Sequence, residues 1–257
     1  KISVIPQSTS KTKIKFKNKK NIISFVGKLN TSKGYDAFGK AIIKILNEFP
    51  DWYSVVVGDE PREKIFFKHK NLKLLGFKKN SFILNMLKKT SISVVPSRWD
   101  EPFGRSSLEA SSRGCALVIS NKGGLMETTN HALILRDVNH NEIYEKIKLL
   151  ILNKKKRLKL QKDTYRNFYL TNDYVSKLID DKRIDTLLNL NSKKHIKILH
   201  ITNLNERFDG RLHYNTGKRI NNGFVRLGHN VLTLSDRDTI NQNRSLTDIS
   251  GINTLNK

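Results

Sequence analysis

The sequence predicts an α/β fold in which a Rossmann-like parallel sheet carries helices on both faces, followed by a partial second α/β unit. Two observations predict this fold. Short runs rich in Val, Ile and Leu recur along the chain, and helix-like stretches lie between several of them. The expected strands are residues 22–26, 54–57, 72–75, 92–95 and 116–119. The length of 257 residues allows one or two domains, and a hydrophobic content of 37% is enough for a globular unit.

Helices are expected between these strands. Residues 35–49 place apolar side chains on one helical face, namely Phe38, Ile42, Ile45 and Leu46, and residues 142–152 form a later helix. Ligands of such parallel sheets bind outside the carboxyl ends of the strands. The residues expected at this edge are Gly27, Gly58, Gly76 and Glu101. For Gly58 and Gly76, a purely turn-forming role is the alternative interpretation.

Residues 101–109, Glu-Pro-Phe-Gly-Arg-Ser-Ser-Leu-Glu, are the most informative segment. They follow a predicted buried strand that a proline closes, so they begin at the carboxyl end of that strand. A turn at Pro102 and Gly104 is expected to lead into a short helix at residues 108–112, with Ser106 or Ser107 as its cap and Gly114 at its end.

This turn predicts an anion site. Unpaired backbone N–H groups near Phe103, Gly104 and Arg105 would face a phosphate at the helix start. Glu109, one turn further along, would accept hydrogen bonds from the hydroxyls of a ribose or hexose. Glutamate pairs with this spacing are common, so the alternative is a loop end at Glu101 and a solvated helix residue at Glu109.

Further segments resemble one enzyme family. They are Phe-Val-Gly-Lys-Leu-Asn-Thr-Ser-Lys-Gly-Tyr-Asp at residues 25–36, Val-Val-Val-Gly-Asp at 55–59, Leu-Leu-Gly-Phe at 74–77 and Gly-Gly-Leu-Met-Glu at 123–127. With the segment at 101–109, they resemble the carboxyl-terminal, donor-binding domain of a GT-B glycosyltransferase of the retaining family 4 type. The resemblance covers residues 22 to about 180, and its segments occur in the family's order.

The resemblance implies transfer of a sugar from a nucleoside diphosphate sugar, with retention of configuration and without a metal ion or other cofactor. It assigns catalytic roles to Lys28 and Lys33, which would hold the donor diphosphate, and to Glu101, which would hold the donor sugar. Lys28 stands where the family more often has Arg, so a point charge replaces a bidentate contact. The donor-binding residues that it implies are Gly27, Gly58, Gly76, Phe77, Phe103, Gly104, Arg105 and Glu109.

The acceptor would be a glycan or a lipid, as in cell-envelope polysaccharide synthesis, and an upstream domain would bind it. Two alternatives stay open for the activity. One is a GT-B sugar-nucleotide epimerase or phosphorylase, and the other is a basic, non-catalytic binding module.

The expected domains are residues 1–188, a linker at 189–195, and residues 196–257. Residues 1–6 resemble the hinge by which an amino-terminal domain enters this one. In the last segment, a strand at 196–201, a helix at 214–227 and a strand at 231–234 resemble the start of a second GT-B amino-terminal domain. A tandem protein is the preferred explanation of this order, and an incomplete gene product is the alternative.

Two minor hypotheses concern this second unit. Asp236 would bind a ribose if the unit bound a dinucleotide, but Gly210 lacks the further glycines of that motif. Arg207, Arg211 and His213 would line an acceptor pocket, with a solvated loop as the default.

The net charge of +25 would suit a nucleic-acid-binding protein, but the sequence contains no recognisable module for reading RNA or DNA. Nucleic acid is therefore an unlikely partner, and a solvated basic surface is the default interpretation. Residues 11–20 and 154–162 would alternatively contact an anionic lipid or a charged polysaccharide. The single cysteine, Cys115, excludes an internal disulfide, so a cytoplasmic location is expected, with peripheral contact to an anionic membrane as an addition.

Overall fold

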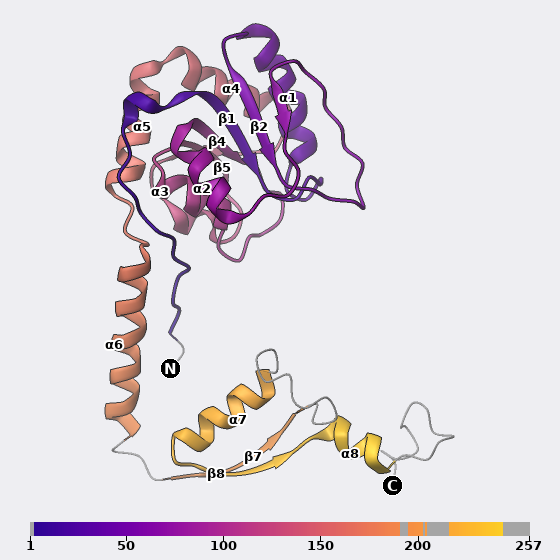
Figure 1. The fold of residues 1–257 in the computed structure, drawn as a ribbon, viewed down its shortest axis with the longest axis vertical. Helices are drawn as coiled ribbons and strands as arrows, with labels where there is room; N and C mark the ends of the chain where they lie inside the picture. Colours follow the sequence, from indigo (N-terminus) through magenta and orange to yellow (C-terminus); the bar gives the residue numbers. More distant parts are fainter. Residues whose placement is uncertain (1–2, 191–194, 203, 205–215, 244–257) are drawn as a thin grey trace. The chain divides into compact units, whose positions relative to one another are not determined.

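The computed structural model describes residues 3–190, 195–202, 204 and 216–243. The chain divides into two compact units, Lys1–Asp180 and Asp181–Lys257 (Figure 1). The helix α6, Asn172–Leu190, runs from the first into the second. The domain boundaries expected from the sequence stay predictions.

The first unit is built on a six-stranded sheet in which every pairing is parallel. Its strands are β1 (Lys20–Val26), β2 (Tyr53–Val57), β3 (Leu72–Leu74), β4 (Thr90–Val95), β5 (Ala116–Ser120) and β6 (Ala132–Leu135). The order is β3-β2-β1-β4-β5-β6. The strands β2 and β3 therefore lie on one side of β1, and β4, β5 and β6 lie on its other side. The carboxyl ends of β1 and β4 therefore flank the topological switch point, where parallel sheets bind ligands.

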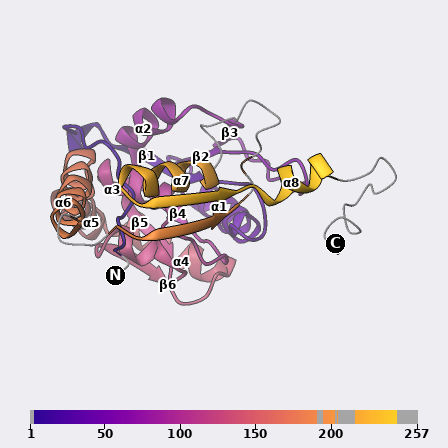
Figure 2. The same ribbon diagram turned by 90° about the horizontal axis from the view of Figure 1, so that it is seen from below.

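Helices cover both faces of this sheet. Their bounds are α1 (Tyr35–Glu48), α2 (Asn80–Lys89), α3 (Arg105–Ser112), α4 (His140–Leu152) and α5 (Lys154–Arg166). The larger core cluster joins α1 and α4 to one face of the sheet, and a second cluster joins α2 and α3 to the other face (Figure 2). The two faces alternate along each strand, because Val94 belongs to the first cluster and Val95 to the second. The Rossmann-like fold class expected from the sequence is confirmed.

Two features of this unit were not expected. The strand β6, with the sequence Ala-Leu-Ile-Leu, lies at the edge of the sheet, and its first three residues are only half-buried. A short 3₁₀ helix, η1 (Phe16–Asn18), precedes β1. Another, η2 (Gly124–Thr128), follows β5 at the Gly-Gly segment, where the resemblance had implied a helix start.

The second unit contains β7 (Lys197–Ile201) and β8 (Asn230–Leu234), which pair in parallel, with α7 (Thr216–Arg226) between them in sequence. This confirms the expected order of strand, helix and strand. The further helix α8 (Asp236–Asn243) was not expected, and it begins at Asp236. Arg207, Gly210, Arg211 and His213 lie outside the described residues. The assignment of this unit to a GT-B domain stays a prediction.

Among the described residues, no helix is both long enough and apolar enough to cross a membrane.

Candidate functional site

A cavity of about 210 Å³ lies at the switch point between β1 and β4. Its walls are the carboxyl end of β1 through Gly27, the carboxyl end of β4 through Ser97, and the first residues of α3. Lys33 and Glu101 complete the lining, so the structure brings two of the three predicted catalytic residues together.

Lys33 and Glu101 form an ion pair in this cavity. The distance from Lys33 Nζ to Glu101 Oε1 is 2.5 Å, and the two side chains are 27% and 14% exposed. Lys28, the other predicted catalytic residue, is exposed and does not line the cavity. Lys33 and Arg105 are therefore the cations that line this cavity, and the Glu101 carboxylate partly neutralises Lys33.

The loop before α1 holds Lys33 in position. The side-chain oxygen of Asn30 accepts hydrogen bonds from the Lys33 backbone N–H and from the Ser32 hydroxyl, both at 3.0 Å. Gly34 has a φ of 70°, and a Cβ there would lie 2.0 Å from the Pro96 carbonyl oxygen. The loop can therefore approach the end of β4 only because residue 34 is glycine.

Arg98 joins the same loop to the start of α1. Its guanidinium donates to both carboxylate oxygens of Asp36, at 2.6 and 3.1 Å, and to the Thr31 carbonyl oxygen at 2.6 Å. Partial burial opposes ionisation of Asp36, but the hydrogen bonds and charge of Arg98 outweigh it. The pKa of Asp36 therefore lies below its ordinary value.

This lowered pKa makes stability depend on pH. The folded state favours the carboxylate, so the Asp36–Arg98 pair stabilises the protein at pH values above the unfolded-state pKa of about 4. This stabilisation is lost as the pH falls through the lower folded-state pKa of Asp36. The pair is partly exposed to solvent, so we expect at most about 1 kcal/mol. Urea unfolding of the wild type and Asp36→Asn should show a stability difference at pH 6 that shrinks by pH 3. A difference independent of pH would contradict this.

The backbone of Glu101 is held by the two glycines at residues 123 and 124. The Gly124 N–H donates to the Glu101 carbonyl oxygen at 2.7 Å, and Gly123 forms a β-bridge with Glu101. A Cβ on Gly123, whose φ is 51°, would lie 2.3 Å from that same oxygen. The Gly-Gly segment singled out in the sequence thus positions the carboxylate of the cavity.

The start of α3 differs from the sequence expectation. The helix begins at Arg105, three residues earlier than predicted, and Gly104 occupies the cap position with a φ of 95°. The predicted serine cap is wrong, because both hydroxyls have other partners. Ser106 donates to the Val26 carbonyl oxygen at 2.8 Å, and Ser107 pairs with Thr128 at 2.6 Å. Ser106 therefore joins the helix start to the end of β1, and the N–H groups of the first turn lie beside the cavity.

Phe103 and Arg105 lie on different sides of this turn. The Phe103 side chain is 7% exposed and packs with Leu108 in a separate small core cluster, so only its backbone is available to a phosphate. Gly104 and Arg105 line the cavity itself.

Glu109 lies in the interior of α3 and is 3% exposed. Its Oε1 accepts from Asn80 Nδ2 at 2.7 Å and from Arg105 Nε at 3.0 Å. The other oxygen, Oε2, accepts no hydrogen bond in the described part of the chain, so it has capacity for a ligand hydroxyl. Sequence reasoning missed Asn80, although it lies just after the segment assigned to the base.

The three predicted glycines lie at adjacent strand ends. The Gly27 N–H donates to the Val57 carbonyl oxygen, and the Gly58 N–H donates to the Gly76 carbonyl oxygen, both at 3.0 Å. A Cβ on Gly58 would lie 1.8 Å from the Gly27 carbonyl oxygen, whereas one on Gly76 would meet no atom within 4 Å. Phe77, which follows, is 75% exposed and therefore available for stacking against a flat ring.

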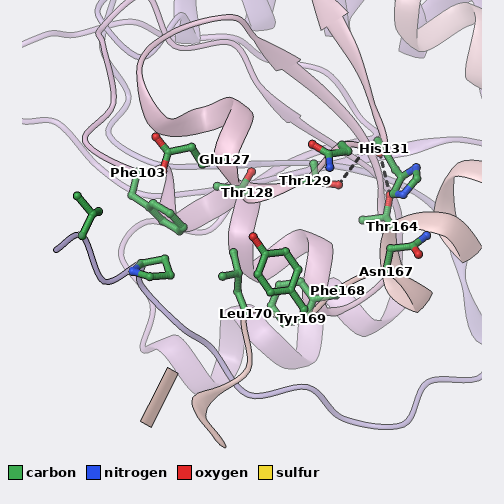
Figure 3. Close-up of a pocket in the computed structure, with 13 residues that line it drawn as sticks. Phe103, Glu127, Thr128, Thr129, His131, Thr164, Asn167, Phe168, Tyr169 and Leu170 are labelled. Carbon is green, nitrogen blue, oxygen red and sulfur yellow. Dashed lines mark hydrogen bonds between the residues drawn. The ribbon is translucent and has the colours of Figure 1, made fainter. Parts of the chain in front are cut away.

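A second cavity, of about 380 Å³, lies on the other side of the Phe103 turn and was not expected from the sequence. Figure 3 shows Phe103, Glu127 and Thr128 along one part of its wall and Tyr169, Thr164 and Asn167 along another. Apart from Phe103 and Glu127, no sequence motif had indicated these residues.

Comparison with known proteins agrees with this geometry. The pattern of the family described as "Glycosyl transferases group 1" matches residues 6–167. The chain belongs to this family. The membership confirms the transferase class expected from the sequence.

Two curated relatives show how far the group 1 similarity extends. The spore coat protein SA of Bacillus subtilis (strain 168) is 27% identical over 164 residues, which are 57% of this chain and 44% of that protein. The 2-deoxystreptamine N-acetyl-D-glucosaminyltransferase of Niallia circulans is 27% identical over 137 residues, 50% of this chain and 35% of that protein. The chain therefore spans less than half the length of these relatives.

Solved structures share the group 1 fold. Anabaena HepE in complex with UDP-glucose has a TM-score of 0.55 and 18% identity, covering 65% of this chain and 49% of HepE. The C-terminal domain of the Francisella tularensis group 1 protein LpcC has a TM-score of 0.51 and 25% identity, covering 63% of this chain and 85% of that domain. The first likeness shows the fold alone.

Within the described residues, no three or more His, Cys, Asp or Glu side chains gather as metal ligands would. The expectation that the reaction needs no metal ion stays a prediction.

Proposed function

We propose that this group 1 chain binds the donor of a retaining glycosyltransferase, which transfers a sugar from a nucleoside diphosphate sugar to a glycan or lipid. The observation that supports the proposal most is the Lys33–Glu101 pair, at 2.5 Å, beside the start of α3 and at the switch point of the sheet. A cation, a set of helix amides and a carboxylate thereby lie around one small cavity.

Each of these groups meets one demand of the reaction. Negative charge grows on the leaving diphosphate as the glycosidic bond breaks, and Lys33 with the first-turn N–H groups of α3 would stabilise it. Glu101 would exchange its ion pair for hydroxyls of the donor sugar. Glu109 would accept from the ribose through Oε2, and Phe77 would contact the base. The departing phosphate would assist deprotonation of the acceptor on the same face, which preserves the configuration.

The donor site can be tested by thermal unfolding with UDP, GDP, ADP and UDP-glucose. We expect at least one nucleotide, at about a hundredfold excess over its Kd, to raise the Tm by about 5 °C or more. Lys33→Ala should lose most of this rise because it removes the cation that pairs with Glu101 beside the start of α3. Lys40→Ala should retain it, because Lys40 is an exposed lysine of α1. A panel without any rise in Tm would contradict the proposal.

A further inference from the structure

A larger hollow, of about 790 Å³, lies at the opposite edge of the sheet from the donor cavity. Three of its lining residues mark that edge. Asn21 and Ser91 lie near the amino ends of β1 and β4, and Asp51 lies just before β2. In a parallel sheet the amino ends of all strands share one edge, so this hollow is distinct from the switch-point cavity.

The two basic segments noticed in the sequence meet at this hollow. Their lining residues are Lys17, Lys19, Lys154, Arg157 and Lys162. The segments are far apart along the chain, since η1 precedes β1 and α5 follows α4. In the folded protein both of them line this hollow.

Two of these five cations stabilise the fold. Lys19 Nζ donates to three backbone carbonyl oxygens at 2.7 to 3.0 Å, and burial lowers the pKa of this lysine. Arg157 donates to the carbonyl oxygens of Leu150 and Ile151 at the end of α4, and its guanidinium lies 5.0 Å from the centre of the Trp52 ring. Neither charge needs a ligand to explain it.

The other three cations have no such role. Lys17, Lys154 and Lys162 are exposed, and in the part of the chain that the structure describes none of them forms an ion pair or a side-chain hydrogen bond. One carboxylate, that of Asp51, lines the same hollow, and it accepts from Asn21 Nδ2 at 2.9 Å. Cations therefore outnumber anions around this hollow.

A buried acceptor also lines the hollow. Gln161 is 1% exposed, and its Nε2 donates to the Ser91 carbonyl oxygen at 2.9 Å. Its Oε1 is buried and finds no hydrogen-bond donor among the described residues. A buried acceptor without a partner costs about 1–3 kcal/mol, so a ligand hydroxyl that reached this oxygen after a small shift of the lining would be favoured.

We propose that this hollow binds an anionic saccharide, a sugar chain that carries sulfate, phosphate or carboxylate groups. Such a ligand matches both features of the lining, because its anionic groups accept from lysine and its hydroxyls donate to an amide oxygen. The concave shape favours a segment of chain over a lipid surface, which would meet a flat or convex face. The inference does not depend on the donor site, because the two sites share no residue.

The test measures binding at low salt by titration calorimetry. The probes are a heparin-derived oligosaccharide, an oligogalacturonate, neutral dextran and phosphatidylglycerol vesicles. The triple variant Lys17→Gln, Lys154→Gln, Lys162→Gln should bind the two anionic saccharides up to about tenfold more weakly than the wild type. Each exposed contact contributes a fraction of a kcal/mol to the binding free energy. Added salt should weaken binding by the wild type, and dextran should not bind.

The matched control loses the same charge elsewhere. It carries Lys40→Gln, Lys73→Gln and Lys177→Gln, at exposed positions outside the hollow, and should bind as the wild type does. An equal loss of saccharide affinity in both triple variants would overturn the proposal, because it would show that the saccharide is attracted by the overall positive charge of the protein. Binding of the vesicles but not the saccharides would overturn it in favour of a membrane surface. A cooperative thermal unfolding transition with a Tm close to that of the wild type shows that the first triple variant is folded.

Discussion

Replacing Glu109 with alanine should weaken nucleotide binding about a hundredfold or more and so abolish the nucleotide-induced rise in Tm. The change removes the Oε2 acceptor proposed for the ribose, and it also releases Asn80 and Arg105 from Oε1. Hydrogen bonds to charged groups are each worth about 1.5–3 kcal/mol, so losing the carboxylate contact with the paired ribose hydroxyls accounts for this magnitude. Titration calorimetry with the nucleotide that stabilises the wild type measures the change.

The control for this experiment is Glu145→Ala, which removes an exposed carboxylate from α4 and should leave nucleotide affinity unchanged. Circular dichroism should show that both variants keep the wild-type helix content. If Glu109→Ala bound the nucleotide as tightly as Glu145→Ala, the buried carboxylate would have a structural role only.

The second large effect is expected at Gly58, where alanine should destabilise the protein by about 3 kcal/mol or more. Its φ is 138°, which side chains rarely adopt, and the added Cβ would lie 1.8 Å from the Gly27 carbonyl oxygen. Backbone strain and overpacking each cost about 1–3 kcal/mol, and here they act together. Urea unfolding measures the loss.

Gly76→Ala is the matched comparison. Its φ of 65° is also unfavourable for alanine, but a Cβ there meets no atom within 4 Å. Only the backbone cost of about 1–2 kcal/mol should therefore appear. If the two substitutions destabilised the protein equally, the close approach of Gly58 to the Gly27 carbonyl oxygen would not contribute to the stability loss of Gly58→Ala.

The sequence predicted the elements whose signal is local. The strands at the centre of the sheet are short and rich in Ile and Val, and α1 has a clear apolar face, so the fold class could be derived from them. The edge strand β6 was missed although all four of its residues, Ala-Leu-Ile-Leu, are apolar. A run of four residues is too short for periodicity to distinguish a strand from other apolar segments.

Within the site, the sequence indicated which residues line the edge of the sheet better than it indicated their hydrogen-bond and ion-pair partners. The sequence placed Lys33, Glu101 and Glu109 at one edge of the sheet, but spacing alone could not reveal that Lys33 pairs with Glu101 or that Asn80 holds Glu109. The predicted serine cap failed for a similar reason. Ser106 and Ser107 bond to residues from other elements, and such long-range competition leaves no trace in a local motif.

The hydrogen-bonded ends of β1, β2 and β3 have a consequence for how such a domain can evolve. At Gly27, Gly58 and Gly76 this edge consists of main-chain atoms, so substitutions of neighbouring side chains leave its hydrogen-bonding groups in place. The glycines themselves are the exception, because an added Cβ at Gly58 meets the Gly27 carbonyl oxygen. The loops around this edge can therefore change while the strand ends stay the same.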